Sequence, residues 1–379
     1  MHILIAPNAF KHSLTAIESA QAIQEGLKRS GLICTSECFP VADGGDGTGH
    51  LIVEKCGGVW HEYDVHDPLG RLIKAPLGII DHGKTAVIEM ADASGIRLLH
   101  PDERSPLMAS SFGTGELIRF ALDRQVSKII IGLGGSATVD GGIGILSALG
   151  MKFRDAEGTE IPALPINMSR FRQIDRSGFD NRILNCQITV LCDVNNLLLG
   201  VKGSAAVFGP QKGARPSDIK LLDLALTNLS NLALQSTGIN MNEILHGGSA
   251  GGIAAALFTF PNARLVNGAE HFLELTAFQK SLNNADLLIT GEGSLDEQTT
   301  QGKAPFAVAK LAKENNIRVI GLAGFVPLHV NAELDKYFDI IIPIGNQPTD
   351  LNKAMKFTAS NLIRTAIVIG KFLSLPKTI

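Results

Sequence analysis

The chain has 379 residues, which is too long for one ordinary hydrophobic core, so we expect two domains. Its 34 basic and 37 acidic side chains give a net charge of −3, and no basic face stands out, which argues against nucleic acid as a partner. The five cysteines form no Cys-x-x-Cys pair, so the sequence predicts neither a disulfide framework nor a zinc site and fits a reducing cytoplasm.

The first residues enter a strand-like apolar run at once, without the basic region and long apolar stretch of a signal peptide. No apolar run approaches the roughly 18 residues that a membrane span needs. We therefore expect a cytoplasmic protein that does not contact a membrane.

Short apolar runs alternate with helix-like segments along most of the chain. A run at residues 3–6 precedes a helix over 15–29, in which apolar residues recur at helical spacing. Further runs follow at 128–131, 187–191, 285–290, 318–322 and 340–344, and further helices over 141–149, 219–238 and 304–313. Apolar runs of this kind are buried on both faces, and their alternation with helices is typical of a parallel α/β sheet.

Residues 60–90 show a different pattern. Strand-like pieces at 61–65, 71–80 and 85–89 are separated by the turns Asp-Pro-Leu-Gly and Asp-His-Gly-Lys, which predicts hairpins and a mixed sheet. We therefore predict two α/β domains. Residues 1–65 and 285–379 form a discontinuous Rossmann-like domain with a parallel sheet, and residues 66–284 form an inserted second α/β domain with the mixed sheet.

The first loop that could carry chemistry is Val-Ala-Asp-Gly-Gly-Asp-Gly-Thr-Gly at residues 41–49. Its glycines allow backbone N–H groups to approach a phosphate closely. The carboxylates of Asp43 and Asp46 can hold the Mg²⁺ that a phosphate carries. The alternative is an Asp-Gly turn that only connects a strand to a helix.

A second glycine-rich loop covers residues 132–144, between an apolar run and a helix. The N–H groups of Gly134, Gly135 and Ser136 could form an anion receptor at the helix start, and Ser136 and Thr138 add hydroxyl donors. Asp140 could ligate a metal or cap the helix. The alternative is tight packing of strand and helix without a ligand.

The third loop, residues 291–303, begins Gly291-Glu292-Gly293 and ends at Lys303. Glu292 and Asp296 could hold a cation or receive a proton. The charge of Lys303 opposes the helix dipole at a predicted helix start, which is explained if it meets a phosphate or a carboxylate. An ordinary exposed lysine is the alternative.

Lys11 and Asp193 each follow a predicted strand, at the end where ligands bind in parallel sheets. Single residues of this kind also have purely structural roles.

Several common nucleotide motifs are absent: the sequence has no P-loop, no Gly-x-Gly-x-x-Gly in a βαβ context and no protein-kinase motif set.

Seven motifs, in order along residues 1–370, resemble the type I glycerate kinase family. They are Phe10-Lys11-x-Ser13-Leu14, Ala42-Asp-Gly-Gly-Asp-Gly-Thr48, Gly113-Thr-Gly-Glu-Leu-Ile118, Gly134-Gly-Ser-Ala-Thr138 with Asp140-Gly-Gly142, Cys192-Asp-Val194, Phe208-Gly-Pro-Gln-Lys-Gly213, and Thr290-Gly-Glu-Gly293 with Gly302-Lys-Ala-Pro305. The resemblance implies a two-domain α/β kinase with its site in an interdomain cleft. It further implies that ATP and Mg²⁺ take part and that D-glycerate is the substrate. The product would be phosphoglycerate, with 2-phosphoglycerate favoured over 3-phosphoglycerate.

Positions after predicted strands and the motif matches together suggest roles for individual residues. Asp43 and Asp46 are the predicted metal ligands, with Asp193 as a competing one. Nucleotide phosphates are assigned to Gly134, Gly135, Ser136, Thr138, Gly291 and Glu292. The predicted catalytic residues are Lys11 and Lys303, which would neutralise the phosphoryl group or the glycerate carboxylate, and Asp296 or Asp193 as the proton acceptor.

The chain departs from the family pattern at several positions. The family usually has Asp-Ser where this chain has Asn8-Ala9, an arginine where it has Ser294, and a second Asp and a Pro where it has Asn195 and Leu197. These departures leave the exact hydroxy acid open.

Two other classes of protein stay open at this point. One is a nicotinamide-dependent hydroxy-acid dehydrogenase, because glycine-rich strand–helix turns also bind dinucleotides. The other is a non-catalytic sensor of sugar acids. The oligomeric state is open too, a homo-oligomer included.

Overall fold

The computed structural model describes residues 1–329 and 332–376. Contacts divide the chain into two compact units: unit 1 comprises Met1–Asp43 and Ala269–Ile379, and unit 2 comprises Gly44–Gly268. The domain boundaries that we expect from the sequence, after residues 65 and 284, lie later in the chain than both of these divisions. No helix among the described residues is long and apolar enough to cross a membrane.

Unit 1 is built on a sheet of five parallel strands in the order β14-β13-β12-β1-β2. Its strands are β1 (His2–Ile5), β2 (Thr35–Cys38), β12 (Leu287–Ser294), β13 (Arg318–Phe325) and β14 (Ile340–Pro343). The chain continues from β1 to β2 on one side and runs through β12, β13 and β14 on the other. The strand order therefore reverses between β1 and β12, which is where open parallel sheets bind their ligands.

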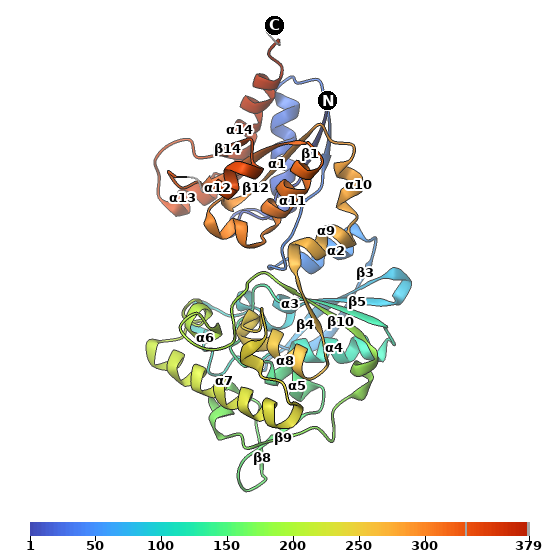
Figure 1. Cartoon of the computed structure of the whole chain (residues 1–379), viewed down its shortest axis with the longest axis vertical. Coiled ribbons are helices and arrows are strands. Elements are labelled where there is room, and N and C mark those ends of the chain that lie inside the picture. The colour runs from blue at the N-terminus through green and yellow to red at the C-terminus, as the bar shows by residue number, and fades with distance from the viewer. Residues whose placement is uncertain (330–331, 377–379) are drawn as a thin grey trace. The chain divides into compact units, whose positions relative to one another are not determined.

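The helices of unit 1 come from both ends of the chain, and α1 and α14 lie side by side in Figure 1. Both helices pack on one core with the sheet, through residues such as Ile23 and Leu362 against Ile3 and Ile289. Helix α1 starts where the sequence predicts, because Thr15 and Glu18 form a reciprocal capping box. The helices are α1 (Ala16–Arg29), α9 (Gly268–Leu275), α10 (Phe278–Leu282), α11 (Ala304–Glu314), α12 (Ala332–Tyr337), α13 (Leu351–Lys356) and α14 (Thr358–Leu373).

Unit 2 is built on a mixed sheet of six strands in the order β11-β10-β6-β5-β4-β3. The first four are parallel to one another, and β4 and β3 are added antiparallel as a hairpin. Its strands are β3 (Val59–His66), β4 (Leu72–Ile80), β5 (Thr85–Glu89), β6 (Lys128–Gly132), β10 (Gln187–Cys192) and β11 (Arg264–Asn267). A small antiparallel sheet, β8-β7-β9, comprises β7 (Lys152–Arg154), β8 (Glu160–Ile161) and β9 (Gln173–Asp175).

Apart from the helix at Thr48–Lys55, the helices of unit 2 share one large apolar core with this sheet. The longest of them, α7, buries Leu222, Leu226, Leu229 and Ala233 on one stripe. It ends at Gly238, whose φ of 77° is the left-handed conformation that a helix stop favours. The helices are α2 (Thr48–Lys55), α3 (Met90–Ser94), α4 (Phe112–Asp123), α5 (Ile143–Ala148), α6 (Ser204–Phe208), α7 (Pro216–Thr237) and α8 (Ile253–Thr259).

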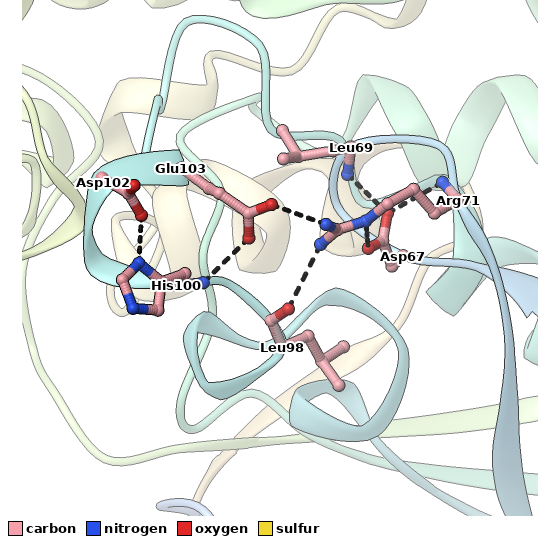
Figure 2. Close-up of polar contacts among 7 residues, drawn as sticks. All are labelled: Asp67, Leu69, Arg71, Leu98, His100, Asp102 and Glu103. Atoms are coloured by element: carbon pink, nitrogen blue, oxygen red, sulfur yellow. Dashed lines mark hydrogen bonds and ion pairs between the residues drawn. The ribbon is translucent and has the colours of Figure 1, made fainter.

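The turn between β3 and β4 is fixed by the carboxylate of Asp67, as Figure 2 shows. This carboxylate accepts from the N–H groups of Leu69 and Arg71 at 2.8 and 2.9 Å and also pairs with the Arg71 guanidinium. The guanidinium reaches on to Glu103 at 2.7 Å and so ties the turn to a neighbouring segment. The predicted hairpin is therefore confirmed. With one parallel and one mixed sheet, so is the predicted fold class.

Candidate functional site

Unit 1 gathers polar side chains where β1 and β12 end. The Asn8 N–H donates to the Gly291 carbonyl at 2.8 Å, and the Thr290 hydroxyl donates to the Ala6 carbonyl at 2.7 Å. These bonds hold the segment after β1 against the end of β12. The point at which the strand order reverses therefore carries Asn8, in the segment after β1, beside the end of β12 that contains Glu292.

Around this point lie Asn8, Lys11, Asp43, Glu292 and Lys303, which we call the unit 1 cluster. Asp43 and Glu292 are 7% and 5% exposed. The Asn8 amide donates to Asp43 Oδ2 at 2.9 Å, and Lys303 Nζ lies 3.7 Å from Glu292 Oε1. Lys303 is at the N-cap of α11, so the predicted lysine at a helix start does meet a carboxylate.

Glu292 is the titratable group of this cluster that the surroundings perturb most clearly. Burial raises the pKa of its carboxyl to about 7; the charge of Lys303 opposes the rise, and that of Asp43 adds to it. The Thr299 hydroxyl donates to Glu292 Oε1 at 3.1 Å, and the charge of Lys11 also favours the ionised form. A carboxyl of this pKa exchanges its proton near neutral pH.

Two other predicted residues of this loop have local partners. Asp296 accepts from the Ser294 hydroxyl at 2.6 Å, and its N–H donates to the Thr299 hydroxyl at 3.1 Å. The loop was expected to begin at Gly291, but β12 continues to Ser294, and Gly291 pairs with Leu322 of β13. Gly291 is therefore part of the sheet rather than of a loop, because its neighbours pair with β13.

In unit 2 the two glycine-rich loops are in direct contact. A Cβ added to Gly134 would lie 2.1 Å from the Gly45 carbonyl carbon and 2.2 Å from the Asp46 nitrogen. Only glycine fits at this position. The Gly134 N–H donates to the Gly44 carbonyl at 3.1 Å. A phosphate could use this N–H only if that bond broke. The N–H groups of Gly135 and Ser136 donate to no backbone carbonyl among the residues that the structure describes.

Asp46 is held by an arginine that no sequence motif indicates. Arg97 donates to Asp46 Oδ1 at 2.8 Å and pairs with Asp92 through its other terminal nitrogen. Asp92 in turn lies 2.9 Å from His50 Nε2. Asp46 and Arg97 are 42% and 44% exposed, so both can reach a ligand from solvent.

Glu89, at the end of β5, lies fully buried beside the same loop. Its Oε2 accepts from the Gly49 N–H at 2.7 Å, and its Oε1 has no hydrogen-bond partner within the described part of the chain. Burial raises the pKa of this carboxyl well above its ordinary value, while the Gly49 bond opposes the rise. The only signal in the sequence is a carboxylate at the end of an apolar run.

Asp140 serves as a buried cap and not as an exposed ligand. Its carboxylate accepts from the Ser111 N–H and hydroxyl at 2.9 and 2.6 Å, and from the N–H groups of Gly142 and Gly144 at 3.0 and 3.3 Å. These bonds fix the turn into α5. Of the two roles open for Asp140, the hydrogen bonds support capping.

Lys212 is a buried lysine in the motif Phe208–Gly213, and we had not assigned it a role. Its Nζ donates to the Ser136 hydroxyl and to the Thr138 carbonyl, each at 2.7 Å. Burial lowers its pKa to about 7, and the charges of Asp140 and Asp193 oppose that change. Asp193, directly after β10, thus lies near the same lysine.

The predicted residues therefore fall into two sets. Lys11, Asp43, Gly291, Glu292, Asp296 and Lys303 belong to unit 1, whereas Asp46, Gly134, Gly135, Ser136, Thr138 and Asp193 belong to unit 2. Asn8, Arg97, Glu89 and Lys212 join them without having been predicted.

The donor atoms fit a hard cation such as Mg²⁺ only in part. Among residues 1–329 and 332–376, no group of three or more His, Cys, Asp or Glu side chains forms a metal site. Mg²⁺ keeps several waters and needs only one or two carboxylates, so the buried carboxylate of Asp43 is compatible with it. Asp46 is compatible too, although it shares its carboxylate with Arg97.

Comparison with known proteins identifies the family. The sequence profile of the glycerate kinase family matches residues 3–374. A glycerate kinase of Bacillus subtilis (strain 168) is 42% identical over 378 residues, covering 100% of this chain and 99% of its own. A glycerate 2-kinase of Escherichia coli (strain K12) is 39% identical over 379 residues, and the match covers 99% of this chain and 98% of that protein.

A crystal structure from Salmonella typhimurium LT2, described as a candidate glycerate kinase 2, superposes with a TM-score of 0.82 at 41% identity and covers 98% of both chains. The resemblance carried by the sequence motifs is thereby confirmed. This result favours the kinase interpretation over the dehydrogenase and sensor alternatives. The chain belongs to the glycerate kinase family and is a phosphotransferase with an alcohol acceptor.

Proposed function

We propose that this enzyme transfers the γ-phosphoryl group of ATP to D-glycerate and releases 2-phosphoglycerate and ADP. The family supports the reaction, and the Escherichia coli relative described as a glycerate 2-kinase supports the position of phosphorylation. We further propose that the two sets of residues act together, in a cleft between the units.

The contact between the two glycine-rich loops carries this proposal. It puts the turn 134–138, with its N–H and hydroxyl donors, against Gly45 and Asp46, which are followed by the first turn of α2. Donors of this kind match the charge of nucleotide phosphates. In our proposal Ser136 and the N–H groups of Gly135 and Ser136 bind ATP phosphates, and Arg97 neutralises further charge.

The unit 1 cluster would bind glycerate and accept its proton. Lys303 and Lys11 supply positive charge for the carboxylate or for the transferring phosphoryl group. We assign the proton acceptor to Glu292 rather than to Asp296. Glu292 is buried beside a lysine and has a pKa of about 7, which suits a general base, whereas Asp296 is bonded within its own turn.

Mg²⁺ is part of the proposal through Asp43 and Asp46, whose carboxylates would hold it. When bound, Mg²⁺ neutralises charge on the β- and γ-phosphates. Asn8 fixes the orientation of Asp43 by donating from its side-chain amide to Oδ2.

The deciding experiment is ³¹P NMR of the products after incubation of the protein with ATP, Mg²⁺ and D-glycerate. We expect a new phosphomonoester signal that coincides with added authentic 2-phosphoglycerate. A signal that coincides with 3-phosphoglycerate would overturn the position of transfer. Absence of any phosphoglycerate would overturn the proposed reaction.

The variant Asp43→Asn tests the metal assignment. We expect turnover to fall on the order of 10²-fold or more even at saturating ATP and Mg²⁺, because a charged ligand of the reacting phosphates is removed. Asp335→Asn is the matched control, since Asp335 is an exposed aspartate on α12 of the same unit. Wild-type turnover in Asp43→Asn would refute the assignment.

A further inference from the structure

Lys212 is a buried charged group for which the proposed reaction has no role so far. It is 3% exposed and ends the short turn Pro210–Lys212. Its two hydrogen bonds go to neutral oxygens, the hydroxyl of Ser136 and the carbonyl of Thr138. Burying an ammonium group is costly unless the site gains from it. The contacts of Lys212 therefore call for a function beyond packing.

These two hydrogen bonds connect Lys212 with the proposed phosphate-binding turn. The residues joined lie 76 and 74 positions apart in the sequence, so the lysine fastens the 134–138 turn to a distant segment. Thr138 adds a buried hydroxyl that has no hydrogen-bond partner among the described residues, so the turn offers one further polar group to a ligand. An anion at the turn would complete it.

The hydrogen-bonding chemistry of lysine sets the direction of the Ser136 hydroxyl. An ammonium group has three donors and no acceptor. When Lys212 is protonated, Ser136 Oγ must therefore accept from it, and the hydroxyl hydrogen of Ser136 is left to point elsewhere. Directed away from Lys212, that hydrogen becomes a donor for an oxyanion, while the bond to the Thr138 carbonyl holds the backbone of the turn in place.

We propose that Lys212 is a positioning residue for the nucleotide: it orients the Ser136 hydroxyl as a donor to a phosphate oxygen of ATP and holds the 134–138 turn in its binding form. This inference rests on the proposed function, because it takes the anion at the turn to be a phosphate of ATP. Lys212 acts through Ser136 and the turn and does not itself touch the reacting atoms.

The test compares Lys212→Met, Ser136→Ala and the double variant with the wild type. Binding of a non-hydrolysable ATP analogue is measured by calorimetry, and KM values for ATP and D-glycerate are measured separately. We expect Lys212→Met to weaken binding of the analogue and to raise the KM for ATP about tenfold or more, as loss of a charge-assisted hydrogen bond predicts. The KM for glycerate should stay within about twofold, since glycerate is assigned to the other cluster.

The double variant separates positioning from general damage. If Lys212 acts through Ser136, the Kd of the double variant for the analogue should lie within about threefold of the Kd of whichever single variant binds it more weakly. Three results would each overturn the proposal. They are a loss of affinity in the double variant that equals the product of the losses in the two single variants, an unchanged affinity for the analogue in Lys212→Met, and equal rises in the KM values for ATP and for D-glycerate. Lys220→Met is the matched control, because Lys220 is an exposed lysine on α7, and it should match the wild type.

Folding is checked by circular dichroism and thermal unfolding. If Lys212→Met does not fold, Ser136→Ala alone decides, because it removes one hydroxyl only; unchanged affinity for the analogue would then overturn the proposal. The two proposals fail separately. A wild type that binds the analogue but does not phosphorylate glycerate refutes the reaction, whereas an active wild type with an unaffected Lys212→Met variant refutes the role of Lys212.

Discussion

The contact of Gly134 with Gly45 and Asp46 gives the most direct prediction from the structure. In Gly134→Ala, the new Cβ would lie 2.1 Å from the Gly45 carbonyl carbon, whereas ordinary contacts begin at 3.4 Å. One of the two loops must therefore move by about 3.4 − 2.1 = 1.3 Å. The φ angle of Gly134 is not in the left-handed region, so this displacement is the main effect of the substitution.

A displacement of this size at a site that positions phosphates should lower kcat/KM for ATP about 10²-fold. Overpacking of this kind also lowers stability by about 1–3 kcal/mol, which thermal unfolding would report. Activity is measured by coupling ADP formation to an optical signal. Gly345→Ala is the control, since no atom of the described residues other than its chain neighbours lies within 4 Å of its added Cβ. If Gly134→Ala keeps kcat/KM within about threefold of Gly345→Ala, the contact between the loops has no part in catalysis.

Three further predictions concern titratable groups and their partners. Glu292→Gln should lower turnover about 10²-fold or more. Because only the ionised carboxylate accepts a proton and burial raises the Glu292 pKa to about 7, wild-type turnover should fall as the pH decreases below about 7; a flat pH profile would refute its role as the base. Asn8→Ala removes a donor to the buried Asp43 carboxylate, and urea unfolding should show a loss of about 1–3 kcal/mol, whereas an unchanged free energy of unfolding would show that the bond is not stabilising. Burial lowers the pKa of Lys212 in the folded chain to about 7, so above that pH the folded chain releases a proton that the unfolded chain still holds; wild-type stability should therefore rise with pH above about 7, and Lys212→Met should reduce this rise.

The sheets could be predicted from the sequence because their strands are short apolar runs, and each run is a local signal. The predicted strand at 128–131 and the observed β6 (Lys128–Gly132) agree closely, and so do the predicted helix at 15–29 and α1. Strand β12 continues to Ser294 although three of its last residues are Gly291, Glu292 and Gly293. The pairing of Gly291, Glu292 and Ser294 with β13 outweighs the turn propensity of the glycines, which a local pattern cannot reveal.

The candidate site was predictable in its loops and not in its contacts. Each glycine-rich loop follows an apolar run, so its place at the carboxyl end of a strand was visible in the sequence. Arg97 and Lys212 carry no such signal. Their partners Asp46 and Ser136 are 51 and 76 residues away, and only the order of the strands brings them together.

These contacts change what the loop at residues 41–49 means. Asp43 and Asp46 were predicted as one pair of metal ligands because both carboxylates lie in the same glycine-rich loop after an apolar run and in the same motif. In unit 1, Asp43 accepts a hydrogen bond from Asn8, and its charge acts on the carboxyl of Glu292. In unit 2, Asp46 accepts a hydrogen bond from Arg97 and lies next to Gly134. One short loop therefore supplies a carboxylate to each set of residues. Substituting Asp43 and Asp46 separately should consequently give different defects, with Asp43 changing the proton and metal chemistry and Asp46 changing the affinity for the nucleotide.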